Sequence, residues 1–244
     1  MALTDGLLAL YHLNNDWLDS SGNGHTLAPS YGPSFVAPGL IGSHAASFDG
    51  IDDKAVTVAA FNSPSSISLQ CWMRRLSNTT LDNFLSKDNY NQSKRDWFQY
   101  VWDNGSVYFG IWTVPSGQLT INTPINTILN DGNKHWVLSD YDHLTGLARI
   151  FVDDPVTPKA SGTMSGGGAL RNTYPYLQLT DVNASGYEDR VFHGYLDEAA
   201  VWDRVLTADE RSQVWNSGAG IEIGAGAAVS GRRRRMMSQG GIWI

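Results

Sequence analysis

Residues 194–215 read GYLDEAAVWDRVLTADERSQVW, and two different periodicities follow one another in this stretch. Polar and apolar residues alternate over 195–198 and the apolar residues 199–202 come next, which is the pattern of a buried β-strand. Thr207 and Glu210 then stand at the spacing of a capping box, in which each side chain accepts a hydrogen bond from the other residue's backbone amide. The stretch therefore predicts a strand that leads directly into a short helix.

Length and composition fit one large globular domain or two small ones, with the residue usage of many short strands and tight turns. The chain has 244 residues, of which only 17% are charged, and its single cysteine, Cys71, excludes an intramolecular disulfide. No run approaches the roughly 18 apolar residues of a membrane span, and the N-terminus lacks the basic segment and cleavage site of a secretory signal. A net charge of −7 argues against nucleic-acid binding.

Alternation of polar and apolar residues predicts several antiparallel strands. An opening strand is expected over residues 7–13, and residues 66–74 alternate strictly, with Cys71 on the apolar side. Residues 97–102 and 107–112 flank the sequence Asp-Asn-Gly-Ser, and Asn-Gly between two alternating runs is a strong signal of a β-hairpin.

Several of these segments resemble, in the right order, motifs of the laminin-G-like (concanavalin A-like) sandwich family. The resemblance implies one antiparallel two-sheet β-sandwich of the jelly-roll kind over residues 1–220, with one short C-terminal helix. Residues 221–244 then form an extended Gly/Ala- and Arg-rich tail. The matching segments are DSSGNG at 19–24, FDGIDD at 48–53, SISLQCWMR at 66–74, DGNKHW at 131–136 and the stretch 194–210.

The same resemblance implies a structural calcium ion where the turn after the first strand meets the last strand. Its ligands in this chain would be Asp19, Asn23 and Asp197, and oxygen groups of this kind are the ligands that calcium takes. The alternative is that Asp19 only caps the turn and Asp197 hydrogen-bonds to backbone groups. Both interpretations remain open at this point.

Catalytic chemistry is not expected. Glycoside hydrolysis needs a pair of suitably spaced carboxylates, and the glutamates of this chain begin no E-x-D-x-E motif; Asp140 and Asp142 share a strand face but stand at a strand end, where solvated aspartates are common. The six histidines show no metal-binding spacing, and Cys71 is expected to be a buried small residue.

The hairpin over residues 97–112 is rich in aromatic side chains that could stack against sugar rings. The alternative is that these rings fill the core, because half of the residues on each strand of a sandwich face inward. The candidate ligand-binding residues are Trp97, Tyr100, Trp102, Tyr108 and Trp112.

The tail lies outside the family resemblance. We expect it to contact another protein subunit, or another copy of this chain, through four guanidinium groups and an apolar end; the alternative is a solvated segment. The residues concerned are Arg232, Arg233, Arg234, Arg235, Ile242, Trp243 and Ile244.

Two hypotheses about function compete. In the first, the protein is a non-enzymatic structural component of a particle, such as a decoration or tail-associated protein of a phage virion. In the second, it is a carbohydrate-binding, lectin-like module of a secreted or cell-surface protein. The missing signal peptide favours the first, and both place the protein on a virion or an extracellular surface.

Overall fold

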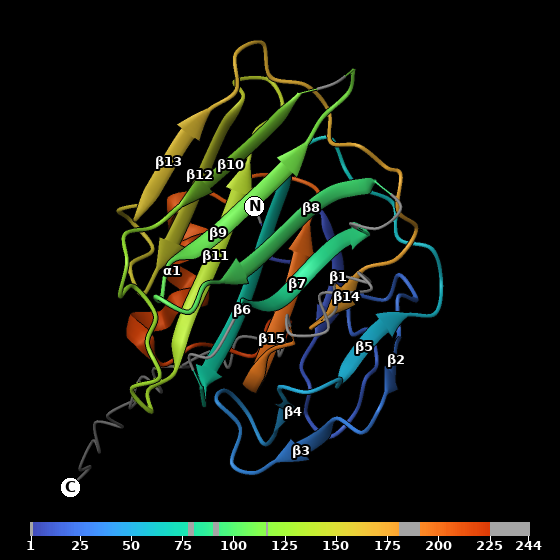
Figure 1. The fold of residues 1–244 in the computed structure, drawn as a ribbon, viewed down its shortest axis with the longest axis vertical. Helices are drawn as coiled ribbons and strands as arrows, with labels where there is room; N and C mark the ends of the chain where they lie inside the picture. Colours follow the sequence, from blue (N-terminus) through green and yellow to red (C-terminus); the bar gives the residue numbers. More distant parts are fainter. Residues whose placement is uncertain (1, 78–80, 90–92, 116, 181–190, 225–244) are drawn as a thin grey trace, which may run out of the picture.

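The structure is a computed structural model that describes residues 2–77, 81–89, 93–115, 117–180 and 191–224. Two antiparallel sheets pack face to face, which confirms the predicted β-sandwich (Figure 1). One sheet has eight strands in the order β13-β12-β11-β6-β15-β4-β3, with β1 paired to β15, and the other has seven in the order β10-β9-β8-β7-β14-β5-β2.

The strands divide between the two sheets as follows. The eight-stranded sheet contains β1 (Leu7–Tyr11), β3 (Ser34–Val36), β4 (Ala45–Asp49), β6 (Ile67–Arg75), β11 (His135–Tyr141), β12 (Leu147–Val152), β13 (Ala160–Thr163) and β15 (His193–Trp202). The seven-stranded sheet contains β2 (Leu27–Ser30), β5 (Lys54–Thr57), β7 (Asp82–Asn89), β8 (Lys94–Val101), β9 (Val107–Trp112), β10 (Gln118–Asn122) and β14 (Gln178–Leu179).

Strand β6 shows how the pleat distributes side chains between two hydrophobic clusters. Its predicted apolar face, which includes Cys71, points into the main core between the sheets. Its other face, which includes Trp72, points away from that core and is nevertheless buried in a second cluster. Both faces of the eight-stranded sheet are therefore covered.

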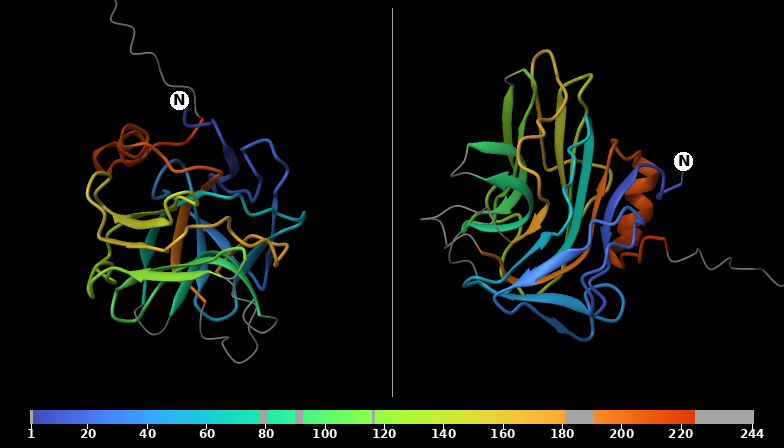
Figure 2. Two further views of the ribbon diagram at one scale, coloured as in Figure 1. Left: turned by 90° about the horizontal axis from the view of Figure 1, so that it is seen from above. Right: turned by 90° about the vertical axis from the view of Figure 1, so that its right-hand side faces the viewer.

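The cover of the second cluster comes from the ends of the chain. Helix α1 (Ala208–Trp215), followed by a 3-10 turn (Asn216–Gly218), packs over the sheet, and the Trp215 ring stacks on Trp72 with centroids 5.5 Å apart. Leu3 and Ile223 join from the two ends. Figure 2 shows helix α1 on the side of the eight-stranded sheet that faces away from the other sheet.

Helix α1 begins as its sequence predicts. The Thr207 hydroxyl accepts from the Glu210 amide, and the Glu210 carboxylate accepts from the Thr207 amide, which completes the capping box. Within the described residues, no helix has the length and apolar character of a membrane span.

Candidate functional site

Five aromatic rings form a continuous row on the outer face of the seven-stranded sheet, which we call the aromatic ladder. Adjacent ring centroids are 4.6–6.2 Å apart, which is contact distance for aromatic pairs. The exposed side chain of Trp102 lies at one end of the row and the mostly buried Trp112 lies at the other. The ladder residues are Phe98, Tyr100, Trp102, Tyr108 and Trp112.

The alternation of strand β8 explains the membership of the ladder. Phe98 and Tyr100 alternate with Gln99 and Val101, whose side chains point to the opposite face. Trp97 has the same parity as Gln99 and is fully buried in the main core. The prediction that Trp97 binds ligand is therefore corrected, whereas the other four predicted aromatics all lie on the outer face.

The sequence interpretation missed Phe98, although alternation could have found it. A residue between Trp97 and Gln99 must point opposite to both, so the parity that removes Trp97 from the outer face also assigns Phe98 to it. The Phe98 ring lies over Gly110 of β9, where an added Cβ would come within 2.3 Å of it. Glycine at 110 thus leaves the space that the Phe98 ring occupies.

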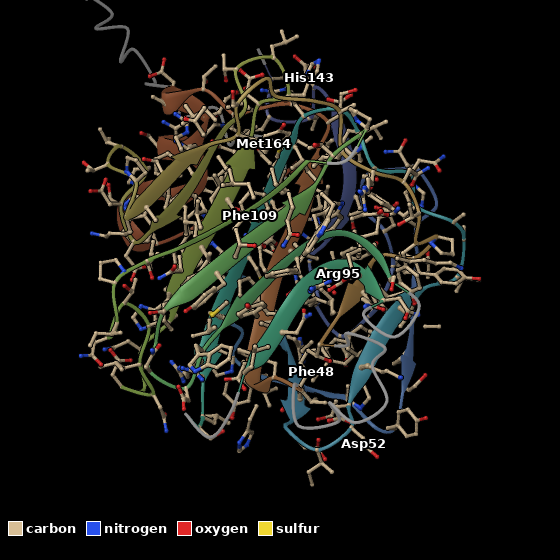
Figure 3. All side chains as sticks on the ribbon, turned by 45° about the horizontal axis from the view of Figure 1, so that its top comes forward. Phe48, Asp52, Arg95, Phe109, His143 and Met164 are labelled. Atoms are coloured by element: carbon tan, nitrogen blue, oxygen red, sulfur yellow. The ribbon has the colours of Figure 1, made fainter. Side chains whose placement is uncertain are left out.

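Arg95 closes the mostly buried end of the ladder. Its guanidinium lies 4.3 Å from the centroid of Trp112 and 5.1 Å from that of Phe98, the geometry of cation–π contacts. The side chain also donates to both carboxylate oxygens of Asp88, at 2.8–3.1 Å. Figure 3 labels Arg95 on β8 and Phe109 on the neighbouring strand β9.

A row of uncharged polar side chains runs beside the ladder on strand β10. Gln118, Thr120 and Asn122 are exposed, whereas Leu119 and Ile121 pack against the main core. In the β9–β10 register these three polar residues stand directly opposite Trp112, Gly110 and Tyr108. Residues in direct register project to the same side of a sheet, so the polar row and the ladder share one surface.

Asn83 of β7 stands opposite Tyr100 in the β7–β8 register and is completely buried. Neither its amide nitrogen nor its amide oxygen has a hydrogen-bond partner among the described residues. A buried amide left unpaired is costly, and within the described residues Asn83 is such a group next to the ladder.

The predicted calcium ligands Asp19 and Asn23 make contacts with the backbone. Asp19 accepts hydrogen bonds from the amides of Leu10, Ser21 and His25; burial alone would raise the pKa of Asp19, but these hydrogen bonds outweigh it and lower the pKa. The amide nitrogen of Asn23 donates to the carbonyls of residues 7 and 8. These are the contacts of a capped turn, and calcium at this turn remains a prediction.

Asp197, the third predicted ligand, lies in the interior. It is fully buried on β15, and its Oδ2 accepts from the amide of Ile41 at 2.7 Å, whereas its Oδ1 has no partner among the described residues. Burial raises the pKa of Asp197 to about 8. The neighbouring Glu198 pairs with His12 at 2.6 Å, so the two acidic residues of this motif have different partners.

One group of three carboxylates that could approach a common ion lies elsewhere among the described residues. Oxygens of Asp49, Asp52 and Asp53 fall within 4.8 Å of one another. Asp53 accepts from the Asp49 amide and Asp49 from the Ile51 amide, so these groups also shape their own loop. Figure 3 places Asp52 and His143 at opposite ends of the sandwich.

The aspartates weighed as a hydrolytic pair are both engaged in structural contacts. Asp140 is buried and receives two hydrogen bonds from the Arg149 guanidinium, at 2.9 and 2.7 Å. Asp142 accepts from the Leu144 amide and the Thr145 hydroxyl, which shapes the turn between β11 and β12. Asp140, expected to be solvated, is therefore a buried partner of Arg149, and Asp142 shapes the turn.

The tail prediction falls outside the described residues. Arg232 to Arg235 and Ile242 to Ile244 belong to residues 225–244, and a role in assembly remains a prediction from sequence. Ile223 is described and is fully buried in the second cluster. The packed part of the chain thus continues three residues past Gly220, where the sequence suggested that the tail begins.

Comparison with known proteins agrees with the fold. The sequence model of the concanavalin A-like lectin/glucanases superfamily, Laminin_G_3, matches residues 49–210. No curated protein sequence matches the chain significantly.

Solved structures with the same fold include a domain of an arabinanase and the binding domains of two other proteins. Domain 4 of the extracellular arabinanase AbnA from Geobacillus stearothermophilus, in complex with arabinotriose, superposes with a TM-score of 0.63 at 19% identity, over 84% of this chain and 96% of that one. The binding domain of Paraclostridial Mosquitocidal Protein 1 gives 0.69 at 14% identity, over 88% and 53%.

The binding domain of Botulinum Neurotoxin DC, in complex with SialylT, gives a TM-score of 0.62 at 12% identity, over 88% of this chain and 52% of that one. This chain therefore spans about half the length of the two toxin chains. At these identities the similarity establishes the sandwich fold alone.

Proposed function

Because the chain belongs to the concanavalin A-like lectin/glucanases superfamily, we propose that it is a non-enzymatic, lectin-like module that binds carbohydrate on the aromatic ladder. The observation that carries the proposal is the cluster of Tyr100, Trp102 and Tyr108 rings, with centroids 5.0–6.2 Å apart, at the exposed end of the ladder.

The physical basis is the shape and polarity of these rings. Aromatic faces carry partial negative charge, which attracts the polarised C–H groups on the flat side of a sugar, and each ring offers a large contact area with little conformational freedom to lose. Trp102 keeps 39% of its surface exposed. The complexes of structural neighbours with arabinotriose and SialylT support carbohydrate as the ligand class.

The proposal is tested by titrating the protein with arabinotriose, xylotriose and 3′-sialyllactose, and by affinity electrophoresis in gels containing linear arabinan or xylan. We expect at least one probe to bind, and Trp102→Ala and Tyr108→Ala each to weaken that binding about tenfold, which corresponds to losing about 1.4 kcal/mol of binding energy. The same probes should release no reducing sugar.

The matched control is Tyr31→Ala, which removes an exposed ring that contacts Lys54 away from the ladder. It should bind as the unmodified protein does. Absence of binding to every probe, or full binding by Trp102→Ala, would exclude the ladder as a carbohydrate site.

A further inference from the structure

The polar row of strand β10 has no evident role in holding the fold together. Its side chains Gln118, Thr120 and Asn122 are exposed, and the packing of β10 comes from Leu119 and Ile121 on the opposite face. Gln118 and Thr120 make no side-chain hydrogen bond within the described residues, and Asn122 uses only its amide nitrogen, which donates to the Thr123 carbonyl.

Strand β10 is the last strand of its sheet, and it is uncharged, as are the other end strands β2, β3 and β13. The sequence of β10 is QLTIN, which has no charge, and its exposed groups are two amides and a hydroxyl. These groups donate and accept hydrogen bonds as sugar hydroxyls do.

We propose that Gln118, Thr120 and Asn122 form the hydrogen-bonding edge of the carbohydrate site, and that together with the ladder they select an extended chain of neutral sugars. This inference rests on the proposed function. The ladder supports the flat faces of the sugar rings, and the β10 row binds their hydroxyl groups from the side. The register places each row residue beside the ladder or beside Gly110 within it.

The length of the row indicates an oligosaccharide. Residues 118 and 122 are four residues apart, which corresponds to about 14 Å along an antiparallel strand, more than one sugar ring spans. The exposed Trp102–Tyr108 end lies beside Asn122, and the row continues from there toward Gln118. If the first sugar unit of an oligosaccharide stacks on Trp102, only its second and further units would therefore reach Thr120 and Gln118.

Charge favours a neutral chain over an acidic one. A carboxylate-bearing sugar binds best to an available cation, but the guanidinium at the ladder, that of Arg95, already binds both oxygens of Asp88. The protein as a whole carries a net charge of −7, which repels polyanions. Amide and hydroxyl groups bind neutral sugar hydroxyls without needing an available cation and without charge repulsion.

The test compares ligand length and charge on the same protein. We expect arabinotriose or xylotriose to bind at least tenfold more tightly than arabinose or xylose, and neutral arabinan or xylan to retard the protein in gels more than polygalacturonate does. Thr120→Ala and Gln118→Ala should each weaken trisaccharide binding about threefold or more, the effect of one lost hydrogen bond. Neither should change binding of the monosaccharide.

The controls are Thr163→Ala on β13 and Gln213→Ala on α1, which remove the same exposed groups from the other sheet and from its helix. Both should bind like the unmodified protein. If trisaccharide binding is lost in Trp102→Ala but unchanged in Thr120→Ala and Gln118→Ala, or if polygalacturonate binds more tightly than the neutral chains, the inference is wrong and the ladder site stands. If no probe binds to the unmodified protein, the proposed function fails as well.

Discussion

The outer faces of the two sheets both carry tryptophan, and they differ in what lies over them. On the eight-stranded sheet, Trp72, Trp136 and Trp202 are buried beneath α1 and the ends of the chain. On the seven-stranded sheet, Trp102 remains exposed and Trp112 is covered largely by Arg95 and its neighbours in the ladder. We call these the covered face and the ladder face.

This difference shows that residue type alone does not decide the role of an aromatic side chain on the outer face of a sheet. On the covered face the rings contribute hydrophobic burial to folding. On the ladder face no described helix covers the rings, and the Trp102 ring stays partly exposed (Figure 2). Substitutions on the covered face should therefore lower stability more than carbohydrate binding. Substitutions on the ladder face should lower carbohydrate binding more than stability.

The largest expected effect on stability is that of Trp136→Ala on the covered face. Trp136 is fully buried, and its indole nitrogen donates to Gln70 Oε1 at 2.8 Å. Loss of the ring should lower the free energy of unfolding by about 3–5 kcal/mol, measured by urea denaturation. Trp136→Phe, which keeps an aromatic ring, should cost less and still bind trisaccharide normally; a loss of binding in that variant would contradict the separation of the two faces.

The next largest effect is expected at Asp19, which anchors strand β1 beside the covered face. Asp19→Ala removes a carboxylate that accepts three backbone hydrogen bonds, and we expect it to lower the free energy of unfolding by about 2 kcal/mol. If Asp19 only caps the turn, Asp19→Ala should lower the free energy of unfolding by the same amount with and without a chelator. A loss that appears only when calcium is present would instead support the predicted calcium site.

A smaller effect is expected at the cap of the helix on the covered face. The ion pair with Arg204, together with hydrogen bonds from Thr207, lowers the pKa of Glu210 to about 2, against opposing burial. Glu210→Gln should therefore lower the free energy of unfolding by about 1 kcal/mol at pH 7.

The pH dependence of that difference follows from linkage. Because the folded-state pKa is below the unfolded value of about 4.3, the stabilisation is fully present above the unfolded pKa and is lost as pH falls toward the folded value. Thermal melts of the two proteins should therefore converge between pH 4.5 and about pH 2. A constant difference across this range would show that charge on Glu210 is not responsible.

The smallest effect on stability is expected for Trp102→Ala on the ladder face. Its ring is 39% exposed, and substitutions at such positions usually change the free energy of unfolding by less than about 1 kcal/mol. The same variant should lose most carbohydrate binding, whereas Trp136→Phe should lose stability and keep carbohydrate binding. A loss of stability as large as that of Trp136→Ala would show that the ladder is a structural layer.

Local sequence signals predicted several elements correctly because the chemistry that makes them is local. The capping box of Thr207 and Glu210 lies within four residues, and the hairpin turn needs a positive φ that Gly105 supplies at 79°. The burial of Cys71 follows from its place on the apolar side of a strictly alternating strand. These predictions needed no knowledge of distant segments.

The candidate site was predicted only in part. The aromatic content of the hairpin pointed to the two strands that carry the ladder, yet Trp97 was included and Phe98 omitted because aromatic type was weighed above strand parity. The β10 row escaped notice because Gln118, Thr120 and Asn122 become a surface feature only beside their partners on β9. The register between β9 and β10 places these residues beside the ladder, and composition does not reveal that register.

The sequence by itself determined several strands, the hairpin at 97–112 and the strand that leads into a capped helix, because alternation, turn residues and caps act over a few residues. The sandwich that unites them was implied by the family resemblance. Tertiary structure alone decided which outer face is closed. Trp72 on β6 and Trp102, directly after β8, both face outward, and only the packing of α1 and Ile223 over the first of them separates a core residue from an exposed one. Burial depends on segments far apart in the chain, so it appears only when the fold brings them together.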